Sequence, residues 1–347
     1  MATRRGVSRR YFWARWPNSR LLQLRLCDLG VTFEGTWLED CVESLYLELE
    51  SRGIRFRPHV WLSDEWFSPG DIPGVAIPFY LTHRTLMRLE RAQMLEVEGG
   101  TRAQCMMILR HEAGHALQHA FQIQRKRRWQ AHFGRSSTRY PREYRPRPAS
   151  RQHVQHLGFW YAQSHPDEDF AETFAVWLTS REAWRKRYRG WPALKKLECV
   201  DELMSEVSLS RPEVTSRARP HSLPRLRYTL AEHYAERRAL YRVSFPDAYD
   251  RDLRRLFSDV PGRRRGEAAS TFLRRNRKDL REMVSRWTGE YQFTLDAVLS
   301  EMIGRCRELK LRAVGPERQL RADFAVLLTV KTMHYLYSRG RRTWIAL

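Results

Sequence analysis

The chain has 347 residues, of which 42% are hydrophobic and 12% aromatic, so it can bury a full core and form more than one lobe, which excludes a disordered protein. Its five cysteines are scattered without a C-x-x-C pair, which excludes a disulfide framework and a zinc ribbon, and no apolar run is long enough to cross a bilayer. Because the N-terminus also lacks an apolar signal segment, we expect a cytoplasmic protein with no membrane partner.

The formal net charge is +22, from 62 Lys and Arg against 40 Asp and Glu. A field of this sign attracts nucleic acid or acidic protein at low salt. The basic residues are nearly all Arg and are spread along the whole chain, and no zinc-finger, homeodomain, RRM or OB motif accompanies them. A nucleic-acid partner is therefore possible on charge alone and has no motif to support it.

The N-terminal part is interpreted as a basic arm over residues 1–35, rich in Arg and Trp, followed by a helix from Trp37 to Arg52. Thr36 is the predicted N-cap of this helix and Gly53 its stop. The apolar positions recur at helical spacing: Leu38, Cys41, Val42, Leu45 and Leu49. This pattern predicts one buried face.

Two strand signals come next in the chain. Ile54 to Leu62 alternates and is rich in β-formers, and Val75 to Leu81 follows two Pro-Gly turns. Pro78 cannot donate a ladder hydrogen bond, so it favours an edge position for the second strand. A short helix is predicted from Leu86 to Met94.

The most informative motif lies on the following helix, which begins at a capping box over Thr101 to Gln104. His111 and His115 are four residues apart, so both imidazoles lie on one helix face and can share a metal ion. Glu112 is beside them, off the ligand line, where a carboxylate can take a proton from an activated water. Gly114 costs about 1 kcal/mol relative to Ala in a helix, which indicates a close neighbour there.

A long basic loop is predicted after this helix, at residues 125–152, which begin with Arg125-Lys126-Arg127-Arg128 and continue into a stretch rich in Tyr, Pro and Arg. Loops of this length are usually functional or mobile. The loop is interpreted either as a lid facing the substrate or as a solvated insertion.

A catalytic zinc site requires a third protein ligand. His119 lies on the same helical face, but eight residues at 1.5 Å rise separate it from His111 by about 12 Å, which is too far for one ion. A second predicted helix, starting at His165, supplies a better candidate. Its Glu168 and Glu172 are one turn apart and form a carboxylate line that can face the imidazoles.

Two neighbouring acids stay open as the ligand, Asp167 and Asp169, although only Glu168 shares a helical line with Glu172. Aromatic residues line the other face of this helix, so Glu172 is expected to be buried. A buried carboxylate without a partner is costly, which predicts a metal ion or a ligating imidazole beside it.

The C-terminal part begins after a break marked by Pro212, Pro220 and Pro224. Apolar residues then recur at helical spacing around Leu230, from Leu273 to Trp287 and from Leu295 to Cys306. The sequence therefore predicts a mostly helical region over residues 225–347.

The His111 motif followed by Asp169-Phe170-Ala171-Glu172 resembles the gluzincin type of metallopeptidase, and most closely a bacterial family of zinc-binding metallopeptidases. The similarity covers roughly residues 38–178. It implies an α+β fold: a gluzincin-like, or zincin, catalytic domain over residues 36–210, with a small sheet and an active-site helix, ahead of the helical C-terminal region.

The resemblance also implies roles for single residues. His111, His115 and Glu168 would be zinc ligands, Glu112 the general base, and Glu172 a carboxylate that orients a ligating imidazole. Tyr161, seven residues before Glu168, matches the place of an oxyanion-stabilising tyrosine in related enzymes. Three neighbours of Tyr161 remain alternatives for that role: Trp160, His156 and His165.

The expected function is Zn²⁺-dependent hydrolysis of peptide bonds in a polypeptide substrate. An extended peptide could pair with open backbone groups of the strand from Val75 to Leu81. The rival interpretation is a basic protein that binds nucleic acid or an acidic partner and carries a structural or catalytically silent zinc.

Overall fold

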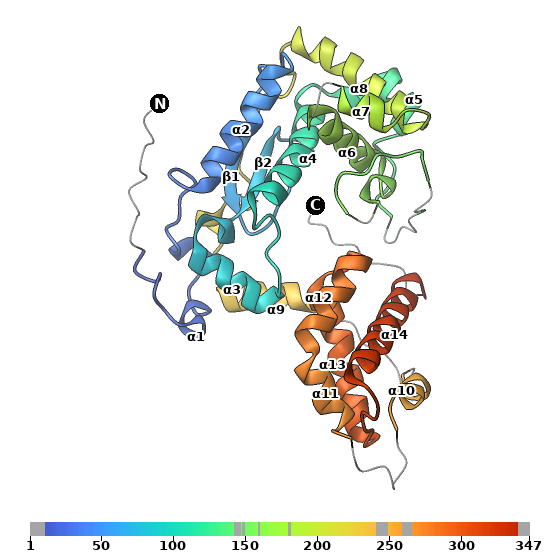
Figure 1. Cartoon of the computed structure of the whole chain (residues 1–347). Coiled ribbons are helices and arrows are strands. Elements are labelled where there is room, and N and C mark those ends of the chain that lie inside the picture. The colour runs from blue at the N-terminus through green and yellow to red at the C-terminus, as the bar shows by residue number, and fades with distance from the viewer. Residues whose placement is uncertain are drawn as a thin grey trace. The chain divides into compact units, whose positions relative to one another are not determined.

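The computed structural model describes residues 11–141, 147, 150–158, 160–179, 182–240, 249–258 and 266–338. These residues form two compact units (Figure 1). The first comprises residues 11–91 and 97–233, and the second comprises residues 92–96 and 234–338. The secondary structure is mostly helical with one small parallel sheet, so the α+β expectation holds only to the extent of two short strands.

The first unit contains most of the elements. Its helices are α1 (Asn18–Leu21), α2 (Trp37–Ser51), α4 (Arg102–Ala120), α5 (Arg127–Phe133), α6 (Pro166–Thr179), α7 (Ala183–Arg187) and α8 (Ala193–Ser208). Its strands are β1 (His59–Ser63) and β2 (Gly74–Pro78). Short 3-10 turns lie at Leu26–Asp28, Phe79–Thr82, Ile123–Arg125, Tyr161–Gln163 and Leu223–Arg225, and α3 (Arg84–Met94) and α9 (Leu230–Leu240) cross the division between the units.

The second unit is helical in its described residues, as expected for the C-terminal region. It is built from α10 (Asp250–Leu256), α11 (Ala269–Arg275), α12 (Arg277–Thr288), α13 (Gln292–Glu308) and α14 (Glu317–Ser338). These helices share one apolar core, in which Phe257, Phe272, Leu299 and Phe324 are almost fully buried. No helix among the described residues of the chain is long and apolar enough to cross a membrane.

The sheet consists of β1 and β2, paired in parallel from His59 opposite Gly74 to Ser63 opposite Pro78. Both predicted strand ranges were too long. The first strand starts only at His59, and the second ends at Pro78, where the chain turns into the 3-10 segment Phe79–Thr82. The chain between β1 and β2 folds back so that Ala76 N–H donates to Phe67 O at 2.8 Å.

This hydrogen bond corrects the expectation that the second strand offers open backbone groups to a peptide. Ala76 lies in the middle of β2, and its N–H is already paired within the chain. Every residue of β2 is buried, which explains the unbroken apolar run in its sequence. The expected pairing of an extended peptide with this strand is therefore not supported.

Two segments predicted to lack structure are folded where they are described. Within the predicted basic arm, Trp13 is fully buried and its indole N–H donates to Leu29 O at 2.8 Å. Within the predicted loop at residues 125–152, α5 buries Trp129 and Phe133. In both segments only a few apolar residues hold the chain in place. They lie among many Arg residues in the sequence, so they form no recognisable hydrophobic pattern. Residues 1–10, 142–146 and 148–149 lie outside the described part of the chain.

Helices α4 and α6, which carry the predicted zinc ligands, pack against each other. α4 lies between the sheet and α6 (Figure 1). As predicted, α4 is capped at its N-terminus by Thr101, whose hydroxyl accepts from Gln104 N–H at 3.3 Å. α6 crosses α4 at Gly114, where an added Cβ would lie 2.9 Å from Ala171 Cα and 3.2 Å from the Phe174 ring. The expectation of a close neighbour at Gly114 is therefore confirmed.

Substitution Gly114→Ala should lower the free energy of unfolding by about 1–3 kcal/mol, because the new methyl group overpacks against α6 backbone. Ala otherwise favours a helix over Gly by about 1 kcal/mol. The matched control is Gly304→Ala on α13, where an added Cβ meets no atom within 4 Å, and a small stabilisation is expected. Urea unfolding measures both changes; a stabilised Gly114→Ala variant would contradict the close approach.

Candidate metal centre

Three side-chain atoms from two helices meet at one buried point. His111 Nε2 and His115 Nε2, on α4, lie 3.2 Å apart. Glu168 Oε2, on α6, lies 3.1 Å from the first and 3.2 Å from the second. None of the three residues is more than 8% exposed. Among the described residues, these three side chains form a group that can hold one metal ion. We call this group the cluster.

The spacing of these atoms fits zinc. A tetrahedral zinc ion bound at 2.0–2.2 Å by nitrogen and oxygen sets its ligand atoms about 3.3 Å apart. The observed separations of 3.1–3.2 Å are close to that value. Two imidazoles and one carboxylate leave a fourth position open, which is typical of catalytic rather than structural zinc.

The carboxylate of Glu172 fixes the orientation of the first imidazole. Its Oε1 lies 2.9 Å from His111 Nδ1, where it would accept the Nδ1 proton and leave Nε2 free to donate its lone pair to a bound metal. The other oxygen, Oε2, accepts backbone N–H groups from Leu157 at 2.9 Å and His156 at 3.3 Å. Glu172 thus has the partner that its burial required.

The electrostatics of the cluster favour positive charge at this point. Burial by itself would lower the pKa of His111, but hydrogen bonds to Glu168 and Glu172 outweigh it and raise this pKa to about 10. Burial would likewise raise the pKa of Glu168, but His115 and His111 hold it well below its usual value. A metal ion held by these residues would take over the positive charge that stabilises the buried carboxylates.

The two aspartates of α6 that were alternatives for the third ligand have other partners. Asp167 accepts hydrogen bonds from Gln118 Nε2 at 2.7 Å and Ser136 Oγ at 2.9 Å. Asp169 is paired with Lys196. The structure therefore brings Glu168, and neither aspartate, to the two imidazoles.

Glu112 is buried on α4, only 5% exposed. Burial raises the pKa of its carboxyl, while the charges of His111 and His115 act to lower it. Its carboxyl group is not one of the three that meet at the cluster. His119 is also outside the cluster, as its distance along the helix predicted, and its ring centroid lies 6.5 Å from that of His115.

Tyr161 lies in the 3-10 turn Tyr161–Gln163, with its ring centroid 5.7 Å from that of His111. The neighbouring histidines have other partners. His156 Nε2 donates to Met107 O at 2.9 Å, and His165 Nδ1 accepts from Asp167 N–H at 3.1 Å. Of the four candidates, Tyr161 is the one whose ring lies next to the ring of a residue in the cluster, His111.

A second tyrosine, which the sequence analysis missed, reaches the cluster from the predicted loop. Tyr140 Oη donates to Glu168 Oε1 at 3.0 Å, leaving Oε2 directed at the imidazoles. Its ring stacks on His165 with centroids 3.6 Å apart. Burial and the nearby Glu168 carboxylate raise the pKa of this phenol, so it remains a hydrogen-bond donor. Because this segment has no periodic pattern, only the unusual tyrosine content could have drawn attention to it.

Residues 90–190 match the sequence model of a family described as "Putative zinc-binding metallo-peptidase". The match contains α4 and α6 and every residue of the cluster. No curated protein and no solved structure matches the chain. The matched family and the donor set of the cluster agree on zinc as the metal.

Proposed function

We propose that this chain is a zinc-dependent metallopeptidase with His111, His115 and Glu168 as the metal ligands. The observation that carries the proposal is the convergence of these three ligand atoms, within 3.2 Å of one another, in the segment that matches the metallopeptidase family. Zinc in such a site acts as a Lewis acid that lowers the pKa of water and polarises a carbonyl.

Glu112 is proposed as the general base. Its carboxyl is close enough to both imidazoles and to Glu168 for their charges to affect its pKa, yet its burial favours the protonated form. A carboxylate with a raised pKa is a stronger base, able to take a proton from the attacking water and pass it to the leaving amine. The gluzincin type of mechanism assigns it this task.

Tyr161 is proposed to donate a hydrogen bond to the oxyanion that develops during attack on a peptide carbonyl. Its ring lies beside that of His111 and is 6% exposed, so a substrate bound near the cluster would meet the tyrosine in a mostly dry environment. Glu172 and Tyr140 act one step further out, as positioning residues for His111 and Glu168.

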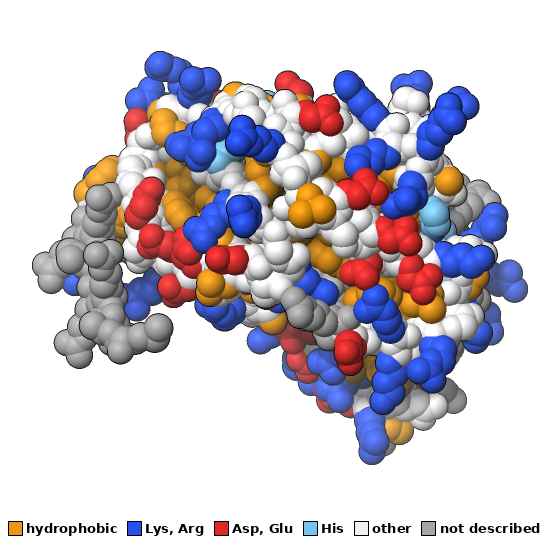
Figure 2. Space-filling view, turned by 90° about the horizontal axis from the view of Figure 1, so that it is seen from above, with side chains coloured by type: hydrophobic (Ala, Val, Ile, Leu, Met, Phe, Trp, Pro, Cys, Tyr) orange, Lys and Arg blue, Asp and Glu red, His pale blue; other side chains and the backbone are white. Residues whose placement is uncertain are grey.

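The proposed substrate is polypeptide, as the family description implies. The face of the molecule seen in Figure 2 does not favour nucleic acid. Figure 2 shows Lys and Arg side chains scattered among Asp and Glu over the face in view, rather than gathered into one stripe. A nucleic-acid-binding surface usually concentrates its basic residues.

Metal content and cleavage of an unfolded protein test the proposal directly. Protein purified without added zinc is expected to contain about one zinc per chain and to cleave reduced, denatured casein. Removal of the metal with a chelator should abolish cleavage, and added zinc should restore it. Zinc without cleavage would contradict the proposed peptidase activity but not the proposed metal centre. Absence of zinc would contradict both proposals.

Substitution Tyr140→Phe should weaken zinc binding by about 10-fold, because outer hydrogen bonds that orient a ligand are typically worth 10–100-fold in metal affinity. Competition with a zinc-sensitive chelating dye measures the change. The matched control is Tyr228→Phe, which removes a tyrosine hydrogen bond to a different carboxylate, Asp64 Oδ2, at 2.6 Å. Equal zinc affinity in the Tyr140 variant and the control would show that the phenol does not position Glu168.

A further inference from the structure

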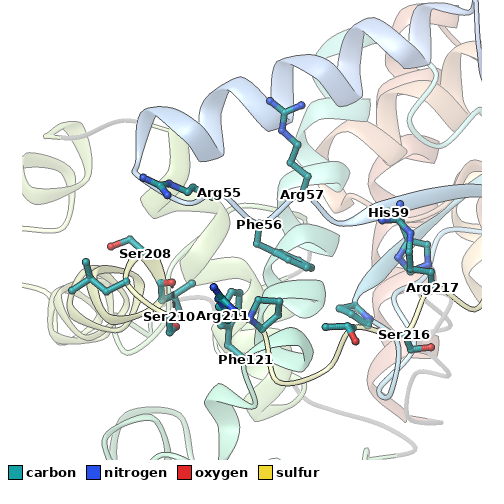
Figure 3. A pocket seen from close by; sticks show the side chains of 15 residues that line it. Arg55, Phe56, Arg57, His59, Phe121, Ser208, Ser210, Arg211, Ser216 and Arg217 are labelled. Atoms are coloured by element: carbon teal, nitrogen blue, oxygen red, sulfur yellow. Dashed lines mark hydrogen bonds between the residues drawn. The ribbon is translucent and has the colours of Figure 1, made fainter.

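A pocket of about 550 Å³ lies in the first unit (Figure 3). It is bordered by the ends of α4 and α8, by the chain that leads into β1, and by the segment that follows α8. None of the proposed zinc ligands lines it. Its volume is within the range of sites that bind small molecules.

The lining contains four arginines, Arg55, Arg57, Arg211 and Arg217, and no Asp or Glu. One of them is already paired: Arg57 lies 3.5 Å from Glu50 and over the Tyr46 ring, and in Figure 3 it extends toward α2. Among the described residues, no ion pair joins the other three guanidinium groups to a carboxylate. Three solvent-exposed guanidinium groups therefore line this pocket without an ion pair to a carboxylate among the described residues.

The partial negative charges at two helix ends offset only part of the positive charge of these arginines. The C-termini of α4 and α8 border the pocket, and each carries about half a negative charge. Together they offset about one of the three guanidinium charges. The last carbonyl of α4, on Ala120, already accepts the N–H groups of Glu213 at 2.8 Å and Val214 at 3.0 Å, so it needs no arginine as a cap. The guanidinium groups therefore remain available to an anionic ligand.

The rest of the lining favours a ligand with an apolar part. The Phe56 ring points toward the side of the pocket where Phe121 and Arg211 lie (Figure 3). Phe56 and Phe121 pack edge to face, with centroids 5.6 Å apart. The side chains of Thr215 and Ser216 add hydroxyl groups. The lining thus combines cationic groups, hydroxyl donors and an aromatic surface.

We propose that this pocket binds a small organic phosphate. A phosphate monoester carries about 1.5 to 2 negative charges at pH 7, and guanidinium groups, three of which line the pocket without an ion pair, are its preferred partners. The ester's organic group would lie against Phe56 and Phe121. A bounded pocket of about 550 Å³ favours such a molecule over an extended nucleic-acid backbone.

Phenyl phosphate is the probe, titrated by calorimetry into the full chain at physiological salt. Saturable binding is expected, with weaker binding of inorganic phosphate and none of benzyl alcohol. The variants Arg211→Gln and Arg55→Gln should each weaken phenyl phosphate binding at least tenfold. The matched control Arg189→Gln removes the same charge at an exposed position of the first unit outside the pocket and should change the affinity less than twofold.

The proposal is overturned if phenyl phosphate does not bind saturably, or if benzyl alcohol or inorganic phosphate binds as tightly. An equal loss in the Arg189 variant would show attraction by net charge alone. Displacement of phenyl phosphate by a short DNA duplex, with a steep salt dependence, would assign the arginines to an extended polyanion instead. Circular dichroism confirms that each variant is folded, and two independent variants keep the test decisive if one is not.

Discussion

Substitution Glu168→Ala is expected to remove zinc from the protein, with occupancy falling from about one per chain to below a tenth after purification without added metal. Glu168 is the single contribution of α6 to the cluster, at 3.1 and 3.2 Å from the two imidazole nitrogens. Because changes to residues that merely orient a ligand cost 10–100-fold in metal affinity, loss of a ligand itself should cost more than about 100-fold. Elemental analysis of the purified variant gives the occupancy.

The control is Asp167→Asn in the same turn of α6. Asp167 is buried like Glu168, but its carboxylate accepts hydrogen bonds from Gln118 and Ser136 and does not reach the cluster. The Asn variant should therefore keep its zinc. Full occupancy in Glu168→Ala would show that the third-ligand assignment is wrong, and equal loss in both variants would show that the metal depends on the folding of this turn.

The cluster could be predicted because its parts are periodic. A capping box and a four-residue spacing were enough to put His111 and His115 on one face of a helix, and the same spacing paired Glu168 with Glu172. The structure brings Glu168 to the two imidazoles and Glu172 to His111 Nδ1. The chemical roles of these residues remain predictions that the variants test.

Gly114 connects the local pattern to this tertiary contact. Its missing side chain lets the backbone of α6 approach at Ala171, three residues after Glu168. The distance between the axes of two packed helices depends on the side chains at their contact. Beside this close contact at Gly114, the Glu168 carboxylate reaches both imidazoles.

Residues outside the periodic segments could not be predicted. Tyr140 reaches Glu168 from a stretch of Tyr, Pro and Arg without helical or strand spacing. The pairing of Ala76 with Phe67 depends on the chain between the strands, and it occupies a backbone N–H of the edge strand that Pro78 had indicated. Contacts of this kind are set by how loops fold back over the core, and no local pattern in the sequence encodes them.

The bounds of the two strands in the parallel sheet were also predicted only in part. Two short buried strands read as alternating or apolar runs whose ends are marked only weakly, so the predicted ranges extended into the neighbouring chain. As Pro78 indicated, β2 is an edge strand of the two-stranded sheet, but it is buried and the proline lies at its end. The position of a proline in a strand is thus easier to notice than to interpret.

Substitution Glu112→Gln is expected to lower kcat/KM for an unfolded protein substrate by about 10²–10⁴-fold, the range contributed by a general acid–base group. Gln has nearly the same shape as Glu but cannot accept the proton. Since the Glu112 carboxyl is not among the three groups that meet at the cluster, zinc occupancy should remain near one per chain. Hydrolysis of a quenched fluorescent casein and metal analysis of the same sample give both quantities.

The control for this variant is Glu198→Gln, an exposed glutamate on α8 in the same unit, which should leave both activity and zinc unchanged. Three outcomes separate the possible roles of Glu112. Loss of activity with zinc retained supports the general base. Loss of zinc together with activity would mean that the carboxylate belongs to the metal site after all. Retention of more than half the activity would contradict the assignment of Glu112 as the general base.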